Sequence, residues 1–392
     1  MPRAGFRHNY SCWVWLAGLA ACHSAGDQSA QSAASLTSSP GTAYYVYRSL
    51  LPGQADSITL HLVNVPAGAS GDGTSSFGSY YGSDEQPFRL SDEQPYLNTA
   101  ADGLVFSDSN PDSTLIPADG YWRLKPQPDG SLTGTVGLHA VRLRLAPAAP
   151  GGLTFVVRYF ADSLAAFPGQ NSPKDRISLQ ALVPVGGPAG VRAALYTNML
   201  RDLRGDTISS AVPLAPEALF KQERATFFTY YRQAVKEQAP NGNPGKESFY
   251  ALNYVHQLAT YLRYHQGNLL SLEFTTYDYW GGAHGGSGTI AASYDLRTGR
   301  RLRYADIFRP RAAEVLPRLL EQAARKELAF ASDVVLYDQQ ASKHMPVPHN
   351  VFLTAGGVEF IYETYALGPG GEVHVFLPLA QVRPLLRENL PF

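Results

Sequence analysis

Alternation of apolar and polar residues predicts β-strands over the first half of the chain. Apolar residues occupy every second position over residues 58–62 and again over residues 141–145. A period of two is typical of a strand with one buried face. Asp129-Gly130 lies between two expected strands, as in the turn of a β-hairpin. Residues 44–185 are therefore predicted to form an all-β antiparallel sandwich or barrel.

Beyond a glycine-rich boundary at residues 185–190, the apolar period becomes helical. Pro216 opens one helix, where its missing N–H costs nothing, and Phe220, Phe227 and Tyr231 share a face of it. Further helices are expected at about residues 249–267 and 312–329, and strands at residues 270–279, 289–296, 351–353, 358–365 and 373–377. We therefore predict a multi-domain protein in which an α+β domain, residues 190–392, follows the β-rich domain.

The N-terminus has the features of a lipoprotein signal peptide. Arg3 and Arg7 precede an apolar run at residues 13–21, which is much shorter than the roughly 20 apolar residues that span a bilayer. Leu-Ala-Ala-Cys at residues 19–22 resembles the bacterial lipobox. The resemblance implies that residues 1–21 are removed and that Cys22 carries lipid. The alternative is an ordinary secretory signal with an incidental cysteine.

Residues 22–43 are expected to be a lipid-anchored flexible tether. Over residues 24–42 serine, alanine, glutamine and glycine dominate, and these residues cannot bury enough apolar surface to offset the entropy of ordering. The residue that follows Cys22 is His23, and no aspartate comes next. By the same resemblance, the protein is expected in the bacterial cell envelope, as a periplasmic protein that is anchored by lipid to the outer membrane.

Composition excludes several classes of protein. The predicted signal peptide contains two arginines and no acid, so the formal net charge of −1 becomes −3 after its removal. This balance argues against nucleic acid as a partner. The two cysteines are Cys12, which leaves with the signal peptide, and Cys22. The mature chain is therefore predicted to lack disulfides, and no cofactor is expected.

A glycine-rich stretch is the most distinctive candidate for a binding site. Five glycines lie among the eight residues 281–288, around one histidine, directly after an aromatic strand end. Glycine allows backbone shapes that other residues avoid, and loops on rigid hairpins often hold ligands. The predicted partner-binding residues are Tyr279, Trp280, Gly281, Gly282, His284 and Gly285. Three roles stay open for His284: a hydrogen bond that shapes the loop, contact with a partner, or metal or acid–base chemistry.

The same stretch carries a resemblance to a known family. Residues 279–285 read Tyr-Trp-Gly-Gly-Ala-His-Gly. This run looks like the motif Tyr-x-Gly-Gly-Ala-His-Gly of a bacterial domain of unknown function. That domain forms the C-terminal part of the lysozyme-sensing anti-sigma factor RsiV and accompanies the peptidoglycan deacetylase PdaC. The likeness continues through Tyr294-Asp295-Leu296 and Asp306-Ile307-Phe308 and covers roughly residues 190–390. The chain departs from the family at the turn after Tyr365.

Catalytic patterns are weak in comparison. The candidate metal ligands at hairpin ends are Asp278, His284, Glu363, Glu372 and His374. No His-x-x-x-His pair and no Gly-x-Ser-x-Gly elbow supports them. We therefore predict no catalytic residue and no metal. His256 is interpreted as a satisfied core residue of the second helix, and the tyrosines near it as helix packing.

Together these patterns favour a non-enzymatic envelope lipoprotein. The resemblance implies that its partner is a lysozyme-like muramidase or peptidoglycan, while lipid on Cys22 provides the membrane contact. The alternative from another class is a cell-wall glycan hydrolase or deacetylase that uses residues at the hairpin ends. A third hypothesis is a purely architectural lipoprotein without a saturable partner.

Overall fold

The computed structural model describes twelve stretches of the chain, which are residues 38–50, 57–66, 74–92, 103–110, 121–147, 151–169, 171–205, 215–239, 251–327, 336–337, 344–368 and 370–392. The expected signal peptide, Cys22 and most of the tether lie outside these residues, so lipidation stays a prediction. Among the helices of the described stretches, none is both long and apolar enough to cross a membrane.

The first eight strands close into an antiparallel barrel, in which each strand pairs with its neighbour along the chain and β1 pairs with β8. They are β1 (Ala43–Leu50), β2 (Ser57–Pro66), β3 (Thr74–Tyr81), β4 (Pro87–Asp92), β5 (Leu104–Asp108), β6 (Tyr121–Pro126), β7 (Leu132–Val136) and β8 (His139–Leu145). Leu60, Phe106 and Trp122 fill the barrel and are fully buried. The β6–β7 hairpin confirms the turn at Asp129-Gly130. Of the two architectures predicted for this part of the chain, the barrel is the one observed.

Strand β2 differs from the expected pattern because both of its faces are buried. Its inward residues belong to the barrel core, as predicted. On the outer face, Val63 and Val65 join Phe155 in a second apolar cluster. The barrel wall therefore serves as one side of a second core, and His61 on that face is only 3% exposed.

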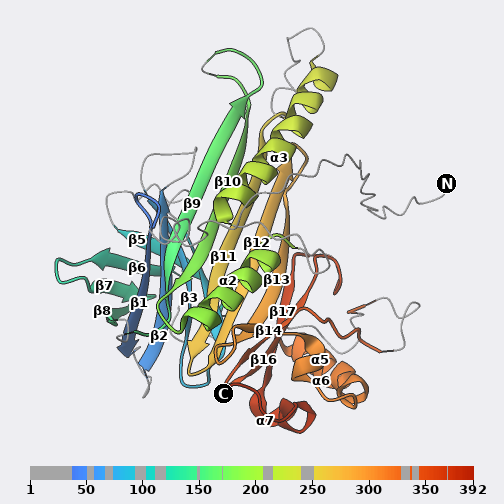
Figure 1. Ribbon diagram of the computed structural model, residues 1–392. Helices are drawn as coiled ribbons and strands as arrows, with labels where there is room; N and C mark the ends of the chain where they lie inside the picture. The colour runs from blue at the N-terminus through green and yellow to red at the C-terminus, as the bar shows by residue number, and fades with distance from the viewer. Residues whose placement is uncertain are drawn as a thin grey trace, which may run out of the picture. The chain divides into compact units, whose positions relative to one another are not determined.

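A six-stranded sheet forms the centre of the molecule, in the order β14-β13-β12-β11-β10-β9 (Figure 1). Its strands are β9 (Thr154–Ala165), β10 (Lys174–Val185), β11 (Tyr254–Gln266), β12 (Leu269–Trp280), β13 (Gly286–Asp295) and β14 (Arg300–Leu302). All neighbours are antiparallel except β10 and β11. The predicted boundary at residues 185–190 placed β9 and β10 with the β-rich part, whereas their hydrogen bonds join them to the C-terminal strands.

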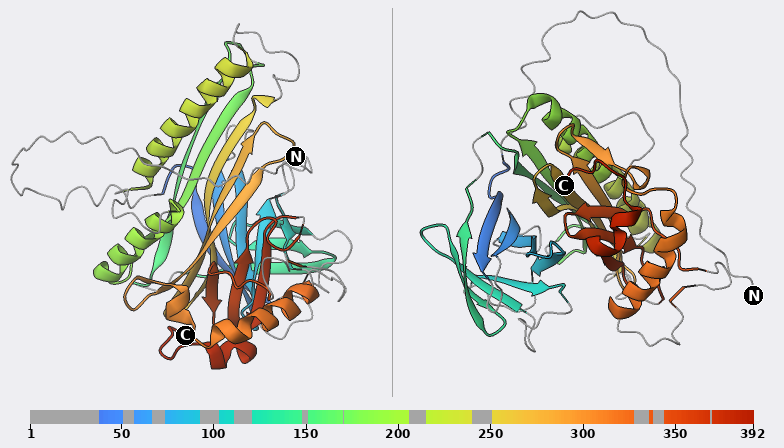
Figure 2. Two further views of the ribbon diagram at one scale, coloured as in Figure 1. Left: turned by 90° about the vertical axis from the view of Figure 1, so that its right-hand side faces the viewer. Right: turned by 90° about the horizontal axis from the view of Figure 1, so that it is seen from below.

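Helices α2 (Ala189–Leu203) and α3 (Pro216–Gln238) connect β10 to β11 and cover one face of the sheet (Figure 1). The start of α3 at Pro216 confirms the prediction. The barrel and the C-terminal sheet pack against the opposite face (Figure 2). There Arg263 of β11 donates to the carbonyl oxygen of Pro87 at 3.0 Å, and Ser271 of β12 donates to that of Leu353 at 2.6 Å.

The helix predicted at residues 249–267 is wrong, because residues 254–266 form strand β11. Leu252, Val255, Ala259 and Leu262 have helical spacing. A central strand that is covered on both faces carries apolar residues at odd and even positions, so its pattern resembles that of a buried helix. The tyrosines near His256 were expected to pack between helices. This interpretation is also wrong, because residues 254–266 form a strand.

The C-terminal part contains a three-stranded sheet of β15 (Val351–Thr354), β16 (Gly357–Tyr362) and β17 (Val373–Pro378). Around it lie α5 (Tyr304–Ile307), α6 (Ala312–Glu327), α7 (Leu379–Val382) and a 3-10 helix (Arg383–Leu385). Leu316 and Leu320 of α6 share a core cluster with Phe360. The strands and α6 match the predictions, and Pro317 lies inside α6.

Candidate functional site

The predicted binding loop is the turn that connects β12 to β13, and we call residues 279–285 the hairpin tip. Trp280 is 48% exposed and the His284 side chain is exposed. The Tyr279 hydroxyl donates to the carbonyl oxygen of Gly282 at 2.9 Å, and His284 Nδ1 lies 2.9 Å from that of Gly285. His284 therefore contacts the backbone of its own loop, which is the first of the three roles considered for it.

Two glycines of this hairpin tip make close contacts, and at Gly281 the backbone requires glycine. Gly281 has a φ of +75°, and a Cβ there would lie 1.7 Å from the carbonyl oxygen of Ala251. A Cβ on Gly285 would lie 2.4 Å from the hydroxyl oxygen of Tyr277. The glycines therefore allow close contacts that fix the path of the loop.

An aromatic cluster anchors the base of the hairpin tip to α3. The Trp280 ring lies edge-on to Phe227 and Tyr254, with centroid distances of 5.2 Å and 5.5 Å. Phe227 is buried and Tyr254 is 7% exposed. Such edge-to-face contacts are each worth about 0.5–1.5 kcal/mol beyond burial. The exposed half of the indole is therefore held on a rigid support.

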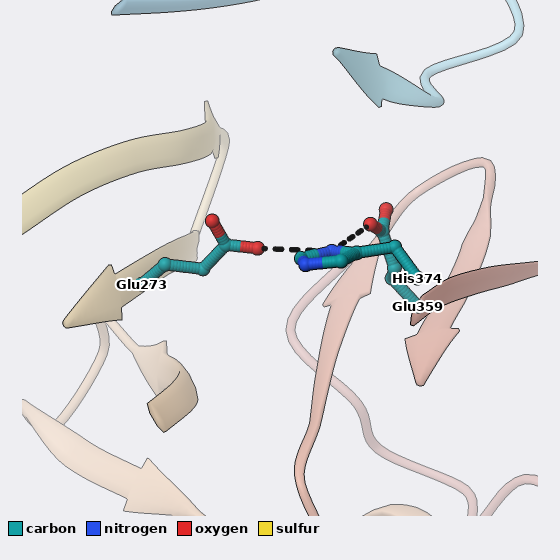
Figure 3. A group of neighbouring side chains, drawn as sticks. All are labelled: Glu273, Glu359 and His374. Atoms are coloured by element: carbon teal, nitrogen blue, oxygen red, sulfur yellow. Dashed lines mark hydrogen bonds and ion pairs between the residues drawn. The ribbon is translucent and has the colours of Figure 1, made fainter. Parts of the chain in front are cut away.

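A second candidate site lies deeper, where three strands bring Glu273, Glu359 and His374 together (Figure 3). We call these three residues the Glu–His cluster. His374 Nδ1 is 2.9 Å from Glu359 Oε1 and 3.6 Å from Glu273 Oε1. Glu273 is fully buried and Glu359 is 4% exposed, while about a quarter of the His374 side chain is exposed.

Two arginines surround the buried carboxylates of the Glu–His cluster. Arg263 of β11 is 2% exposed, with its Nε 3.4 Å from Glu273 Oε1 and its Nη2 3.7 Å from Glu359 Oε1. Arg89 of the barrel donates through Nε to Glu273 Oε2 at 2.7 Å. Burial raises the pKa of Glu273, but the charges of Arg263, Arg89 and His374 outweigh it and lower the pKa to about 2. Glu273 is therefore a carboxylate throughout the physiological pH range.

The Glu–His cluster borders a cavity of about 420 Å³ between the barrel and the two sheets. Arg89, Arg263, Glu359 and His374 line it, together with Glu372 and Ser287. The Glu372 carboxylate accepts hydrogen bonds from the amide and the hydroxyl of Thr289, both at 2.7 Å. Ser287 belongs to the glycine-rich stretch, so this stretch forms part of the wall of a charged cavity.

A larger cavity, of about 770 Å³, lies where the barrel meets β9 and β11. In its wall the Tyr44 hydroxyl is 2.8 Å from His61 Nδ1, and His61 Nε2 is 3.4 Å from the hydroxyl of Tyr81. Tyr81 in turn donates to the carbonyl oxygen of His265 at 3.0 Å. Burial, followed by the charges of His265 and Arg48, lowers the pKa of His61 to about 3. The neutral imidazole therefore joins the barrel to the sheet as a hydrogen-bonded link.

The structure separates most of the metal ligands considered from the sequence. Of the five, only His374 belongs to the Glu–His cluster. Asp278 pairs with His256, with 2.6 Å between Oδ1 and Nδ1, whereas Glu363 is exposed. His256 thus lies on a strand, with Nδ1 partnered, while its buried Nε2 has no hydrogen-bond partner, so the interpretation as a satisfied core residue holds only in part. The sequence reasoning missed Glu273 and Glu359, although a glutamate within each of two apolar strands was an available signal.

Comparison with known proteins supports the fold and leaves the function open. No protein-family model and no curated protein sequence matches the chain. A member of the DUF3298 family from Bacteroides fragilis has a similar structure, with 20% identity and a TM-score of 0.50 over 60% of this chain and 94% of that one. A DUF3298 family protein from Pseudomonas aeruginosa PAO1 has 19% identity and a TM-score of 0.42 over 61% and 98%, respectively.

The Bacteroides fragilis structure confirms the expected likeness to a domain of unknown function in its coarse form. About three fifths of the chain has the fold of a DUF3298 protein. The finer assignment, to the type found in RsiV and PdaC, stays a prediction. At this level of identity the likeness concerns the fold alone, so a function has to be argued from the site itself.

Proposed function

We propose that this protein is a non-enzymatic lipoprotein of the cell envelope that binds a protein or glycan partner through the hairpin tip. The observation that carries the proposal is the exposure of Trp280 on a rigid aromatic base. A lysozyme-like muramidase or peptidoglycan is the expected partner, from the sequence resemblance. Lipid on Cys22 would hold the protein at the outer membrane, where such partners are accessible from the periplasm.

The geometry of the hairpin tip is suited to recognition. Exposed aromatic side chains contribute much of the binding energy at interfaces, and Trp is enriched among such residues. A loop already fixed by Tyr279 and His284 loses little conformational entropy when a partner binds. The tip therefore offers both an apolar anchor and a pre-shaped backbone.

Replacing Trp280 with alanine is expected to weaken partner binding by at least about 30-fold, because a buried interface tryptophan is worth about 2 kcal/mol or more. His284→Ala is expected to weaken it less, by about tenfold, through loss of the loop shape. Binding is measured by interferometry with an immobilised muramidase and by co-sedimentation with purified peptidoglycan.

The matched control is Tyr230→Ala on α3, which removes another exposed aromatic ring, 61% exposed, outside the hairpin tip. This variant should bind as the unmodified protein does. Equal binding by Trp280→Ala and Tyr230→Ala would exclude the tip as the site. Absence of saturable binding to both partners would overturn the proposed function and favour an architectural role.

The second candidate function is a cell-wall glycan hydrolase or deacetylase, and the Glu–His cluster beside its cavity is the observation that favours it. Carboxylates and an imidazole are the groups that such reactions use. Turnover of acetylated glycan that disappears in His374→Gln would support this function. Absence of turnover by the zinc-loaded protein would exclude it.

A further inference from the structure

The spacing of the Glu–His cluster is close to that of a metal site. One ligand atom from each residue lies within 4.8 Å of the others. The two distances from His374 Nδ1 are 2.9 Å and 3.6 Å. Metal bonds of about 2.0–2.1 Å place the donor atoms of a tetrahedral site roughly 3.4 Å apart. The three atoms could therefore share one cation after small side-chain shifts.

An atom without a hydrogen bond points into the Glu–His cluster. Glu273 Oε2 accepts from Arg89, but the buried Oε1 accepts no hydrogen bond and has only ion-pair contacts, 3.4 Å from Arg263 Nε and 3.6 Å from His374 Nδ1. In Figure 3 this carboxylate faces the imidazole of His374 across the space between the sheets. A buried acceptor left without a hydrogen bond costs about 1–3 kcal/mol. This atom is therefore suited to a ligand that can occupy the cluster.

The charges around the cavity also favour a divalent cation. Three carboxylates that are buried or half-buried (Glu273, Glu359 and Glu372) and two guanidinium groups (Arg89 and Arg263) surround it. Their formal charges leave −1. A divalent cation would offset this excess in a region where charges are poorly screened. The two arginines alone do not balance the acids.

We propose that Glu273, Glu359 and His374 bind one divalent transition-metal ion. Imidazole nitrogen selects such ions over magnesium and calcium, which prefer sites made of oxygen alone. Three protein ligands leave a fourth coordination position, and the cavity lies next to it. The metal site does not rest on the proposed binding function, because no residue of the hairpin tip is a ligand.

The competing interpretation is a permanent ion-pair network without metal. In that case Arg263 and His374 neutralise the two glutamates, as the distances of 3.4 Å and 2.9 Å allow. This interpretation predicts that added metal neither binds stoichiometrically nor stabilises the fold. The two interpretations therefore differ in results that can be measured.

The test uses the full chain, produced without a polyhistidine tag and stripped with a chelator. Titration with zinc chloride in a calorimeter should give one site per chain, and zinc should raise the thermal unfolding temperature. Magnesium chloride should do neither. His374→Gln and Glu359→Gln should each weaken zinc binding by at least about 100-fold, because each removes a direct ligand.

Two controls separate loss of the site from loss of the fold. His349→Gln makes the same exchange at a histidine that stacks on Tyr304, and Glu372→Gln alters the same cavity outside the Glu–His cluster. Both should retain zinc binding. Circular dichroism in chelator checks that every variant is folded. Absence of a stoichiometric site, or binding that survives both cluster variants, would overturn the proposal while leaving the hairpin-tip experiment unaffected.

Discussion

Replacing Glu273 with glutamine is expected to lower the free energy of unfolding by about 3–5 kcal/mol. The exchange leaves Arg263, which is 2% exposed, beside a neutral amide, and it removes the carboxylate that accepts from Arg89. An uncompensated buried charge costs more than the lost attraction alone. Urea unfolding at pH 7 in the presence of chelator measures the effect without a contribution from metal.

The control for this prediction is Glu388→Gln, which breaks the exposed pair between Arg309 and Glu388. Glu388 is 84% exposed, so the change should stay within about 1 kcal/mol. A loss of similar size for both variants would mean that Glu359 already balances Arg263. It would contradict the view of Glu273 as the main counter-charge of the buried network.

Local patterns were sufficient to predict most strands, but not their partners. The alternation over residues 58–62 and the turn at Asp129-Gly130 fix side-chain direction and hairpin pairing within a few residues. The assignment of β9 and β10 to the six-stranded sheet depends on the parallel contact between β10 and β11. That contact links residues about 80 positions apart, such as Ile177 and His256, and no local period encodes it.

The two candidate sites also differed in how far the local sequence could predict them. The hairpin tip was predictable because glycine density and a single strand end define it locally. The Glu–His cluster combines side chains from β12, β16 and β17, and its arginines come from β4 and β11. Glutamate within an apolar strand signals a buried charge, but the sequence does not say which strands will face each other.

Asp175 provides a second test of buried charge, on the helix-covered face of the sheet. This residue of β10 is fully buried, and neither carboxylate oxygen has a hydrogen-bond partner. Burial raises its pKa, the charge of Asp162 raises it further, and Arg232 and His256 oppose the shift. The resulting pKa is about 7, compared with an ordinary value of 3.8.

The sign of the pH effect follows from the tighter proton binding of the folded state. Stability contributed by the protonated Asp175 is fully present below about pH 4 and is lost as pH rises to about 7. Asp175→Asn keeps a neutral side chain at every pH. We expect the variant to be more stable than the unmodified protein by about 2–4 kcal/mol at pH 8, because one pKa unit corresponds to about 1.4 kcal/mol. The difference should decline toward zero near pH 4.

Urea unfolding of both proteins between pH 4 and pH 8 measures this difference. Burial also lowers the pKa of His61 to about 3 and that of His265 to about 4, and these groups reduce stability as pH falls below 6.5. Because both proteins contain these histidines, their contribution cancels in the comparison. A gap between the two stability curves that stays constant over the whole pH range would show that Asp175 is not protonated in the folded protein at neutral pH.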